Sequence, residues 1–166
     1  VDRTNRGPTT TTPTTGVLAI TARALVVVSI ASEGGPYAAA NYRHAQEIPQ
    51  PNRTRLLATT FAELSVTRLD AVTLRLRPGG GFLAHDMHRL VRGPSRPFRV
   101  GDRVELSDLT ATVTEISGDG RPLTVEFRFR TPLESPEWLW MRGQGLGRVE
   151  WTPPRVGDTV VVPAGF

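Results

Sequence analysis

Residues 109–130 read LTATVTEISGDGRPLTVEFRFR, and this stretch contains a clear hairpin pattern. Apolar and charged side chains alternate from Val125 to Arg130, which places the apolar ones on one face of a strand and the charged ones on the other. Gly118-Asp119-Gly120 separates this run from the preceding one, and Asp-Gly between two alternating runs is typical of a hairpin turn. The stretch therefore predicts two antiparallel strands joined by a tight turn.

Residues 64–77 show the same period of two. Apolar residues alternate with serine, threonine and arginine in residues 64–67 and again in residues 72–77. Residues 69–71 are predicted to form the turn between the two strands. One face of this pair should pack on a core, while the other face, which carries Arg75 and Arg77, should be polar.

The tetrapeptide Arg-Val-Gly-Asp occurs twice, at residues 99–102 and 155–158, and a valine-rich run follows each copy. Gly-Asp permits a tight turn without steric cost, and β-branched residues favour strands. Strands are therefore predicted at residues 102–106 and 159–162. A further hairpin is predicted from residues 138–141 and 148–151, across Gly143-Gln144-Gly145.

Two more segments complete the fold prediction. Residues 24–30, ALVVVSI, form a continuous apolar run, which predicts a strand buried on both faces. Residues 37–46 are rich in alanine and follow a proline, which favours a helix. Together the elements predict a mainly β fold (α+β at most). We expect a single β-sandwich or partly closed barrel of short antiparallel strands with one helix near residues 37–46.

The sequence divides into a tail and a domain. Residues 1–15 form an extended threonine- and proline-rich tail with too little apolar surface to fold alone, and residues 16–166 form the β-rich domain. We expect a partner protein to hold the tail. The candidate contacts in it are Thr9, Thr10, Thr11, Thr12 and Pro13.

The composition excludes several classes of site. The 166 residues include no cysteine, which excludes disulfides and thiol chemistry. All basic residues are arginine, and the net charge of +4 gives only a modest attraction to anionic surfaces. The most apolar stretch, residues 17–31, contains Arg23 and is shorter than the roughly twenty residues of a membrane-spanning helix. We interpret it as a buried strand with a lead-in.

Six short motifs, in a fixed order, carry a resemblance to a known family. They are the strand at residues 25–29, LRLRPGGGFL at 74–83, RLVRGP at 89–94, FRVGD at 98–102, GDGRP at 118–122 and WTPPRVGD at 151–158. From about residue 25 to residue 163 the chain resembles an uncharacterised C-terminal extramembranous domain of large multipass bacterial membrane proteins. The resemblance implies proximity to a membrane, and it brings no catalytic residue.

Two groups of side chains are candidates for a metal site or a catalytic site. His85, Asp86 and His88 lie within one predicted turn, but a zinc site needs a further ligand, and His44 is the only other histidine. Exposed loop histidines are the preferred interpretation, and no metal or cofactor is expected. Separately, two carboxylates lie near a pair of tryptophans in the sequence, and acids paired with stacked aromatics occur in some glycosidases. These residues are Glu134, Glu137, Trp138 and Trp140.

Arginines gather in the middle of the chain. With two phenylalanines nearby they could bind phosphates and stack on bases, or they could meet acidic protein or anionic lipid headgroups. The residues concerned are Arg75, Arg77, Arg89, Arg92, Arg96, Arg99, Phe82 and Phe98. A docking surface is preferred to a nucleic-acid surface.

The sequence as a whole predicts a non-catalytic accessory or structural subunit. We expect it to dock on integral membrane subunits of a bacterial complex (respiratory, transport or photosynthetic), peripheral to the membrane at its periplasmic face. A β-barrel nucleic-acid-binding module and a hydrolase with a site near Trp138 and Trp140 are the two alternatives. The predicted interface residues outside the tail are Arg89, Arg92, Trp138, Trp140 and Trp151, since arginine and aromatics favour interface centres.

Overall fold

A computed structural model describes residues 24–29, 51, 53–85, 95–144 and 147–164 of the chain. In these residues the secondary structure consists of ten strands in two sheets, without a helix. The helix predicted near residues 37–46 and the tail at residues 1–15 lie outside the described residues. The prediction of a mainly β fold is confirmed.

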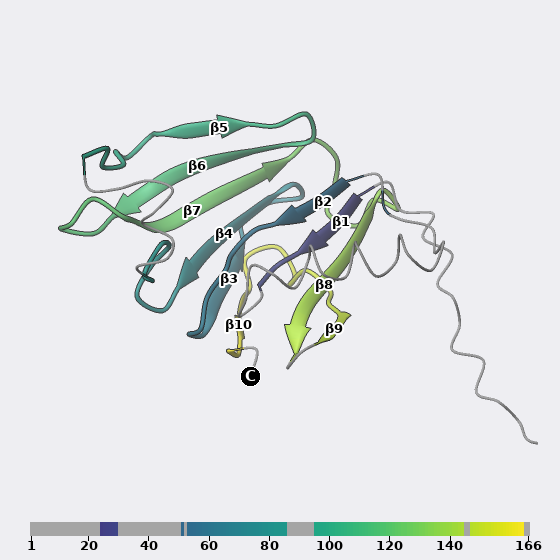
Figure 1. Cartoon of the computed structure of the whole chain (residues 1–166). Helices are drawn as coiled ribbons and strands as arrows, with labels where there is room; N and C mark the ends of the chain where they lie inside the picture. Colours follow the sequence, from purple (N-terminus) through teal and green to yellow (C-terminus); the bar gives the residue numbers. More distant parts are fainter. Residues whose placement is uncertain (1–23, 30–50, 52, 86–94, 145–146, 165–166) are drawn as a thin grey trace, which may run out of the picture.

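The larger sheet has six strands in the order β10-β3-β4-β7-β6-β5, and every neighbouring pair is antiparallel (Figure 1). Both hairpins predicted from the period of two are confirmed, with β3 joined to β4 and β6 joined to β7. The strands are Leu64–Arg68 (β3), Thr73–Pro78 (β4), Arg103–Glu105 (β5), Leu109–Ile116 (β6), Pro122–Phe129 (β7) and Thr159–Val162 (β10).

The smaller sheet has four strands in the order β2-β1-β8-β9. They are Ala24–Val27 (β1), Arg53–Leu56 (β2), Trp138–Gln144 (β8) and Gly147–Glu150 (β9), and the predicted β8–β9 hairpin is confirmed. Unlike the other pairs, β1 runs parallel to both β2 and β8. This pairing agrees with the continuous apolar sequence of β1, because strands with parallel neighbours are buried on both faces.

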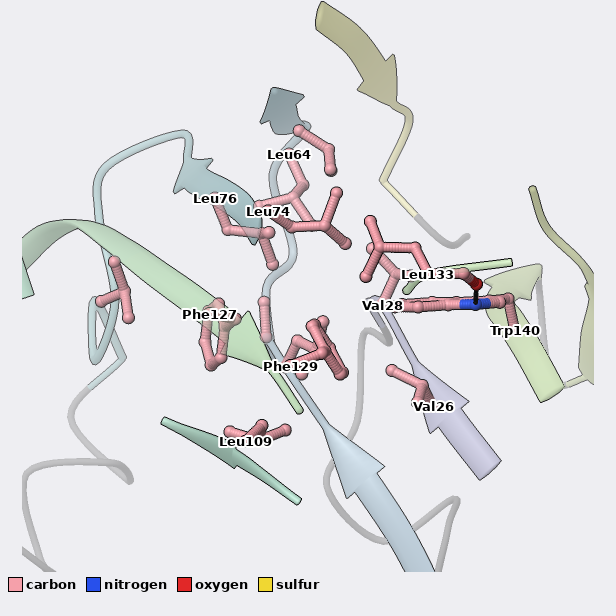
Figure 2. Close-up of a cluster of buried hydrophobic side chains, with 14 of the residues drawn as sticks. Val26, Val28, Leu64, Leu74, Leu76, Leu109, Phe127, Phe129, Leu133 and Trp140 are labelled. Atoms are coloured by element: carbon pink, nitrogen blue, oxygen red, sulfur yellow. Dashed lines mark hydrogen bonds between the residues drawn. The ribbon is translucent and has the colours of Figure 1, made fainter. Parts of the chain in front are cut away.

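The two sheets share one hydrophobic core and form a sandwich-like fold without a closed barrel. Val26 and Val28 at β1 and Trp140 of β8 meet Leu74 of β4 and Phe129 of β7 in a single cluster (Figure 2). Leu74 and Leu76 of β4 and Val125, Phe127 and Phe129 of β7 lie in this cluster, because they alternate with charged residues that face away from it.

The two Arg-Val-Gly-Asp turns are built in the same way. In each turn the aspartate N–H donates to the arginine C=O at 3.0 Å, and the glycine has a positive φ, 91° for Gly101 and 89° for Gly157. A third residue with positive φ defines a type II turn, which explains the glycine. Each glycine N–H also donates to a carbonyl of the adjacent strand, at Val113 and Arg68 respectively. Each turn therefore starts an edge strand of the larger sheet.

The similarity between the two Arg-Val-Gly-Asp turns extends to the strands around them, over the whole six-stranded sheet. Strand β10 flanks the β3–β4 hairpin as β5 flanks the β6–β7 hairpin. When Arg68 is matched with Val113, the registers align residues 73–77 (TLRLR) with residues 124–128 (TVEFR). The sheet thus consists of two similar three-stranded units, with the cross-strand pair of Arg75 and Glu126 at its centre. Among the buried positions on the core face, Arg68 is a charged residue whose equivalent in the other unit is the apolar Val113.

Candidate functional site

The predicted interface tryptophans surround the junction of the two sheets. Trp138 and Trp140 are buried in β8, and their rings meet Phe129 edge-on, at centroid distances of 5.3 and 5.2 Å. Trp151 is partly buried and packs against Trp140, with centroids 5.8 Å apart. The tryptophans therefore hold the core together. The other predicted interface residues, Thr9 to Thr12, Pro13, Arg89 and Arg92, lie outside the described residues.

The indole nitrogens of the two buried tryptophans bond to the loop before β8. Trp140 Nε1 donates to the carbonyl of Leu133 at 2.8 Å, as Figure 2 shows, and Trp138 Nε1 donates to the carbonyl of Pro132 at 3.1 Å. A buried N–H needs an acceptor, so these two bonds fix the loop against β8. The loop carries Glu134 and Glu137, the two carboxylates predicted to lie near the tryptophans.

Arg68 fastens the same loop to the larger sheet. The guanidinium is buried, and it forms a two-pronged hydrogen bond with the carboxylate of Glu134, with Nη2 and Oε2 3.0 Å apart. Its remaining donors bond to the carbonyls of Asp70, Ala71 and Pro154 at 2.9–3.3 Å. One side chain therefore ties together the β3–β4 turn, the loop before β8 and the loop before β10.

Among the residues that the structure describes, four carboxyl groups have pKa values below their ordinary range. The hydrogen bond from Arg68 lowers the pKa of Glu134, and the N–H of Val72 lowers that of Asp70. The hydroxyl of Thr124 lowers the pKa of Glu115. Ser117 and then Arg121 bond to Asp119 in the β6–β7 turn and lower its pKa to about 2. All four groups thus favour the charged form in the folded protein.

We expect the melting temperature to fall as the pH is lowered from about 5 to about 2. A carboxyl with a lowered folded-state pKa stabilises the fold above its unfolded pKa, and this contribution is lost as the pH falls through the folded pKa. Thermal unfolding followed by circular dichroism across this range is the measurement. Ser117→Ala should raise the pKa of Asp119 towards 3.8, as followed by NMR titration. A melting temperature that stays constant over this range would contradict the expectation.

A polar cavity of about 600 Å³ lies where one end of the larger sheet meets one end of the smaller sheet. Because β1 is parallel to both neighbours, Arg53 of β2 and Trp138 of β8 both lie level with Ala24. Asp108, just before β6, lies beside Arg130, just after β7, and the N–H of Arg130 donates to the carbonyl of Asp108 at 2.9 Å. The cavity is lined by Ala24, Arg53, Ser107, Asp108, Arg130, Thr131, Glu137 and Trp138.

Asp108 is the most enclosed carboxylate of this cavity. Its side chain is only 8% exposed, and Arg55 Nε donates to its Oδ1 at 3.0 Å. Sequence reasoning missed Asp108, Arg53 and Arg55. A Ser-Asp pair between two strands is typical of a plain turn, and the strand Arg53–Leu56 has no apolar pattern. The parallel pairing of β1 with β2 brings Arg53 to the cavity, where Arg53 and Arg55 form ion pairs with Asp108.

An apolar groove of about 450 Å³ lies on the core face of the larger sheet, next to its edge strand β5. Val104 of β5 is 58% exposed at this groove, although it is apolar. In Figure 1, β5 is the strand of the larger sheet farthest from β8 and β9. The apolar lining comprises Leu57, Phe82, Leu83, Phe98, Val104, Ala111, Val113, Pro122, Val125 and Phe127.

The predicted arginine cluster is only partly described. Arg75 and Arg77 lie on the exposed face of β4, as expected, and each meets a carboxylate: Arg75 Nη2 is 2.7 Å from Glu126 Oε1, and Arg77 bonds to Glu115. Phe82 and Phe98 pack against the core instead of facing these arginines. Arg75 and Arg77 therefore form ion pairs across the sheet.

The described residues include no group of three histidine, cysteine, aspartate or glutamate side chains that could hold a metal ion. His85 is exposed and its ring meets Phe61 edge-on at 4.6 Å, while Asp86, His88 and His44 lie outside the described residues. Within the same part of the chain, no helix has the length and apolarity needed to cross a bilayer. A scan against protein-family models and searches of curated proteins and solved structures found no match.

Proposed function

We propose that this chain is a non-catalytic docking module that binds an integral membrane subunit of a bacterial complex. The observation that carries the proposal is the apolar groove beside the edge strand β5. Interfaces between proteins have apolar centres, and an exposed apolar recess is the usual place for a partner's side chains. The resemblance to C-terminal domains of multipass membrane proteins supports membrane subunits as the partner class, at the periplasmic face.

The backbone of β5 supports an extended segment as the bound element. Leu106 N–H donates inward to Leu109, so by alternation Arg103 and Glu105 direct their backbone groups to the open edge. A partner strand added there would place every second side chain over the groove, the mode known as β-augmentation. The net charge of +4 favours an acidic partner segment or one near anionic lipid headgroups. The occupant is therefore an extended apolar segment with acidic residues.

The two alternatives have less support from the geometry. Phosphate binding needs available cations, whereas Arg75 and Arg77 already bond to carboxylates. A sugar-hydrolase site needs an open aromatic face, whereas Trp138 and Trp140 are buried with their rings against Phe129. Docking through the groove requires neither arrangement.

The test is extraction of native membranes in mild detergent, followed by size-exclusion chromatography and mass spectrometry of proteins that co-elute with the chain. We expect stoichiometric co-elution with integral membrane subunits. Val104→Asp should reduce it about tenfold or more, because a charge would enter the apolar groove. Val161→Asp is the matched control, since Val161 is 57% exposed on the opposite edge strand β10.

Two results would overturn the proposal. One is elution of the unaltered chain alone, near 18.1 kDa. The other is co-elution that Val104→Asp and Val161→Asp reduce equally, which would place the contact away from the groove. Circular dichroism of both variants checks that the fold is kept, and the high exposure of both valines favours this.

A further inference from the structure

The polar cavity beside Trp138 has the dimensions and the side chains of a ligand site. Its volume of about 600 Å³ falls within the range of small-molecule pockets, about 300–1,000 Å³. It lies just before β6, at Ser107 and Asp108, whereas the groove is lined by Ala111 and Val113 within β6, and the two share no lining residue. Its occupancy is therefore a question separate from partner docking.

One oxygen of Asp108 lacks a hydrogen bond. Arg55 Nε donates to Oδ1 at 3.0 Å, but Oδ2 is buried without a hydrogen-bond partner among the residues that the structure describes. The nearest cation in an ion pair with it is Arg53, whose Nη1 lies 3.7 Å from Oδ2, beyond hydrogen-bond distance. A buried acceptor without a donor destabilises the fold, so Oδ2 favours a donor brought by a ligand.

Arg53 is placed to uncover this oxygen. Its side chain is 51% exposed, and its ion pair with Oδ2, at 3.7 Å, is weak. A negative group in the cavity would draw the guanidinium of Arg53 towards itself. Asp108 would stay in place, because Arg55 holds its other oxygen and the N–H of Arg130 holds its backbone.

The charges around the cavity favour a ligand with a single negative charge. Three positive side chains (Arg53, Arg55 and Arg130) and two negative ones (Asp108 and Glu137) surround the cavity. Their net charge is one positive charge. The fork of an arginine matches the geometry of a carboxylate. A phosphate dianion would exceed this charge and would also be repelled by the two carboxylates. The charge balance therefore favours a carboxylate.

The remaining lining favours hydroxyl groups on the same ligand. Ser107 can donate or accept, Thr131 can accept because its hydroxyl already donates to Glu137 Oε2 at 3.4 Å, and Asp108 and Glu137 accept. Trp138 is 8% exposed and its ring packs on Phe129, so it offers an edge and no open face for stacking. Neutral sugars and nucleobases, which depend on stacking, fit less well than a charged polyol.

We propose that this cavity binds a hydroxyl-bearing carboxylate of the sugar-acid class. The carboxylate lies on Arg53 and Arg130, and a ligand hydroxyl donates to Oδ2 of Asp108. Such a group comes either from a free sugar acid or from a uronate unit of an acidic polysaccharide, and both present the same carboxylate and hydroxyls.

Isothermal titration calorimetry of the full chain with D-glucuronate is the test. D-glucose keeps the ring hydroxyls without the carboxylate, and acetate keeps the carboxylate without the hydroxyls. We expect both to bind at least about tenfold more weakly than glucuronate. An oligoglucuronate that binds more tightly than the monomer identifies the polymer as the source, and equal affinity identifies the free acid.

Variants connect the binding to this cavity. Arg130→Gln should weaken glucuronate binding about tenfold or more, and it should leave the fold intact because Arg130 is exposed. Arg128→Gln is the matched control and should not change glucuronate binding, because Arg128 is also exposed, two residues earlier, but does not line the cavity. Absence of glucuronate binding at millimolar concentrations, or an equal loss in both variants, would overturn the proposal.

Discussion

Phe129→Ala is expected to lower the free energy of unfolding by about 3–5 kcal/mol. Phe129 is 2% exposed, and its ring touches both Trp138 and Trp140 edge-on. Truncation leaves a cavity between the sheets and removes two aromatic pairs, each worth about 0.5–1.5 kcal/mol beyond burial. Urea unfolding followed by tryptophan fluorescence measures the change directly, because all three tryptophans of the chain lie in this region.

Val161→Ala provides the comparison for this experiment. Val161 is 57% exposed on the edge strand β10, so its truncation creates no cavity and should change the free energy of unfolding by less than about 0.5 kcal/mol. Equal effects of the two substitutions would mean that the junction of the sheets does not carry the stability assigned to it.

Arg68→Ala is expected to cost about 2–4 kcal/mol, the second largest effect. The guanidinium donates to the carbonyls of Asp70, Ala71 and Pro154, and its removal takes one hydrogen bond from each in a partly buried place, although the Ala71 carbonyl keeps the N–H of Leu133 at 3.0 Å. The ion pair with Glu134 adds little, because that carboxylate is 64% exposed and solvent screens it. The loss therefore comes mainly from the three carbonyls.

Glu134→Gln separates these two contributions. It removes the charge of the carboxylate and leaves the three carbonyl bonds of Arg68, so the expected cost is below about 1 kcal/mol. Arg68→Lys keeps the charge but cannot reach three separate carbonyls, and it should cost nearly as much as Arg68→Ala. Chemical unfolding of the three variants gives the order. If Glu134→Gln were as costly as Arg68→Ala, the ion pair would be the main contribution.

The sequence predicted the antiparallel strands well, because their side chains alternate. The β3–β4 and β6–β7 hairpins follow from residues 64–77 and 109–130, where a single period of two fixes which face is buried. The strand Arg53–Leu56 could not be found in this way, since three of its four residues are polar and its pairing with β1 is non-local. Parallel neighbours leave no local turn that would mark them.

The candidate site was predicted only in part, for a related reason. Trp138 and Glu137 attract attention as an aromatic beside a carboxylate, and they do lie at the polar cavity. Asp108 lies 30 positions before Trp138 in the sequence and Arg53 lies on a strand that has no apolar pattern, so nothing in the sequence links them to Trp138. The register of β2, β1 and β8 places Arg53 level with Trp138, and Asp108, just before β6 of the larger sheet, meets Arg53 and Arg55 there through ion pairs.

The two-unit arrangement of the larger sheet has a consequence for the order of folding. Strands β5, β6 and β7 follow one another in the chain, so that unit can close through short loops. The other unit needs β10, and Thr67 meets Thr159 across a separation of 92 residues. Because a long loop costs more entropy to close, β5–β6–β7 can assemble while β3 and β4 still lack their edge strand. Moving β10 from its place in the chain to a position directly before β3 would give both units the same local order, and with it the same advantage in folding.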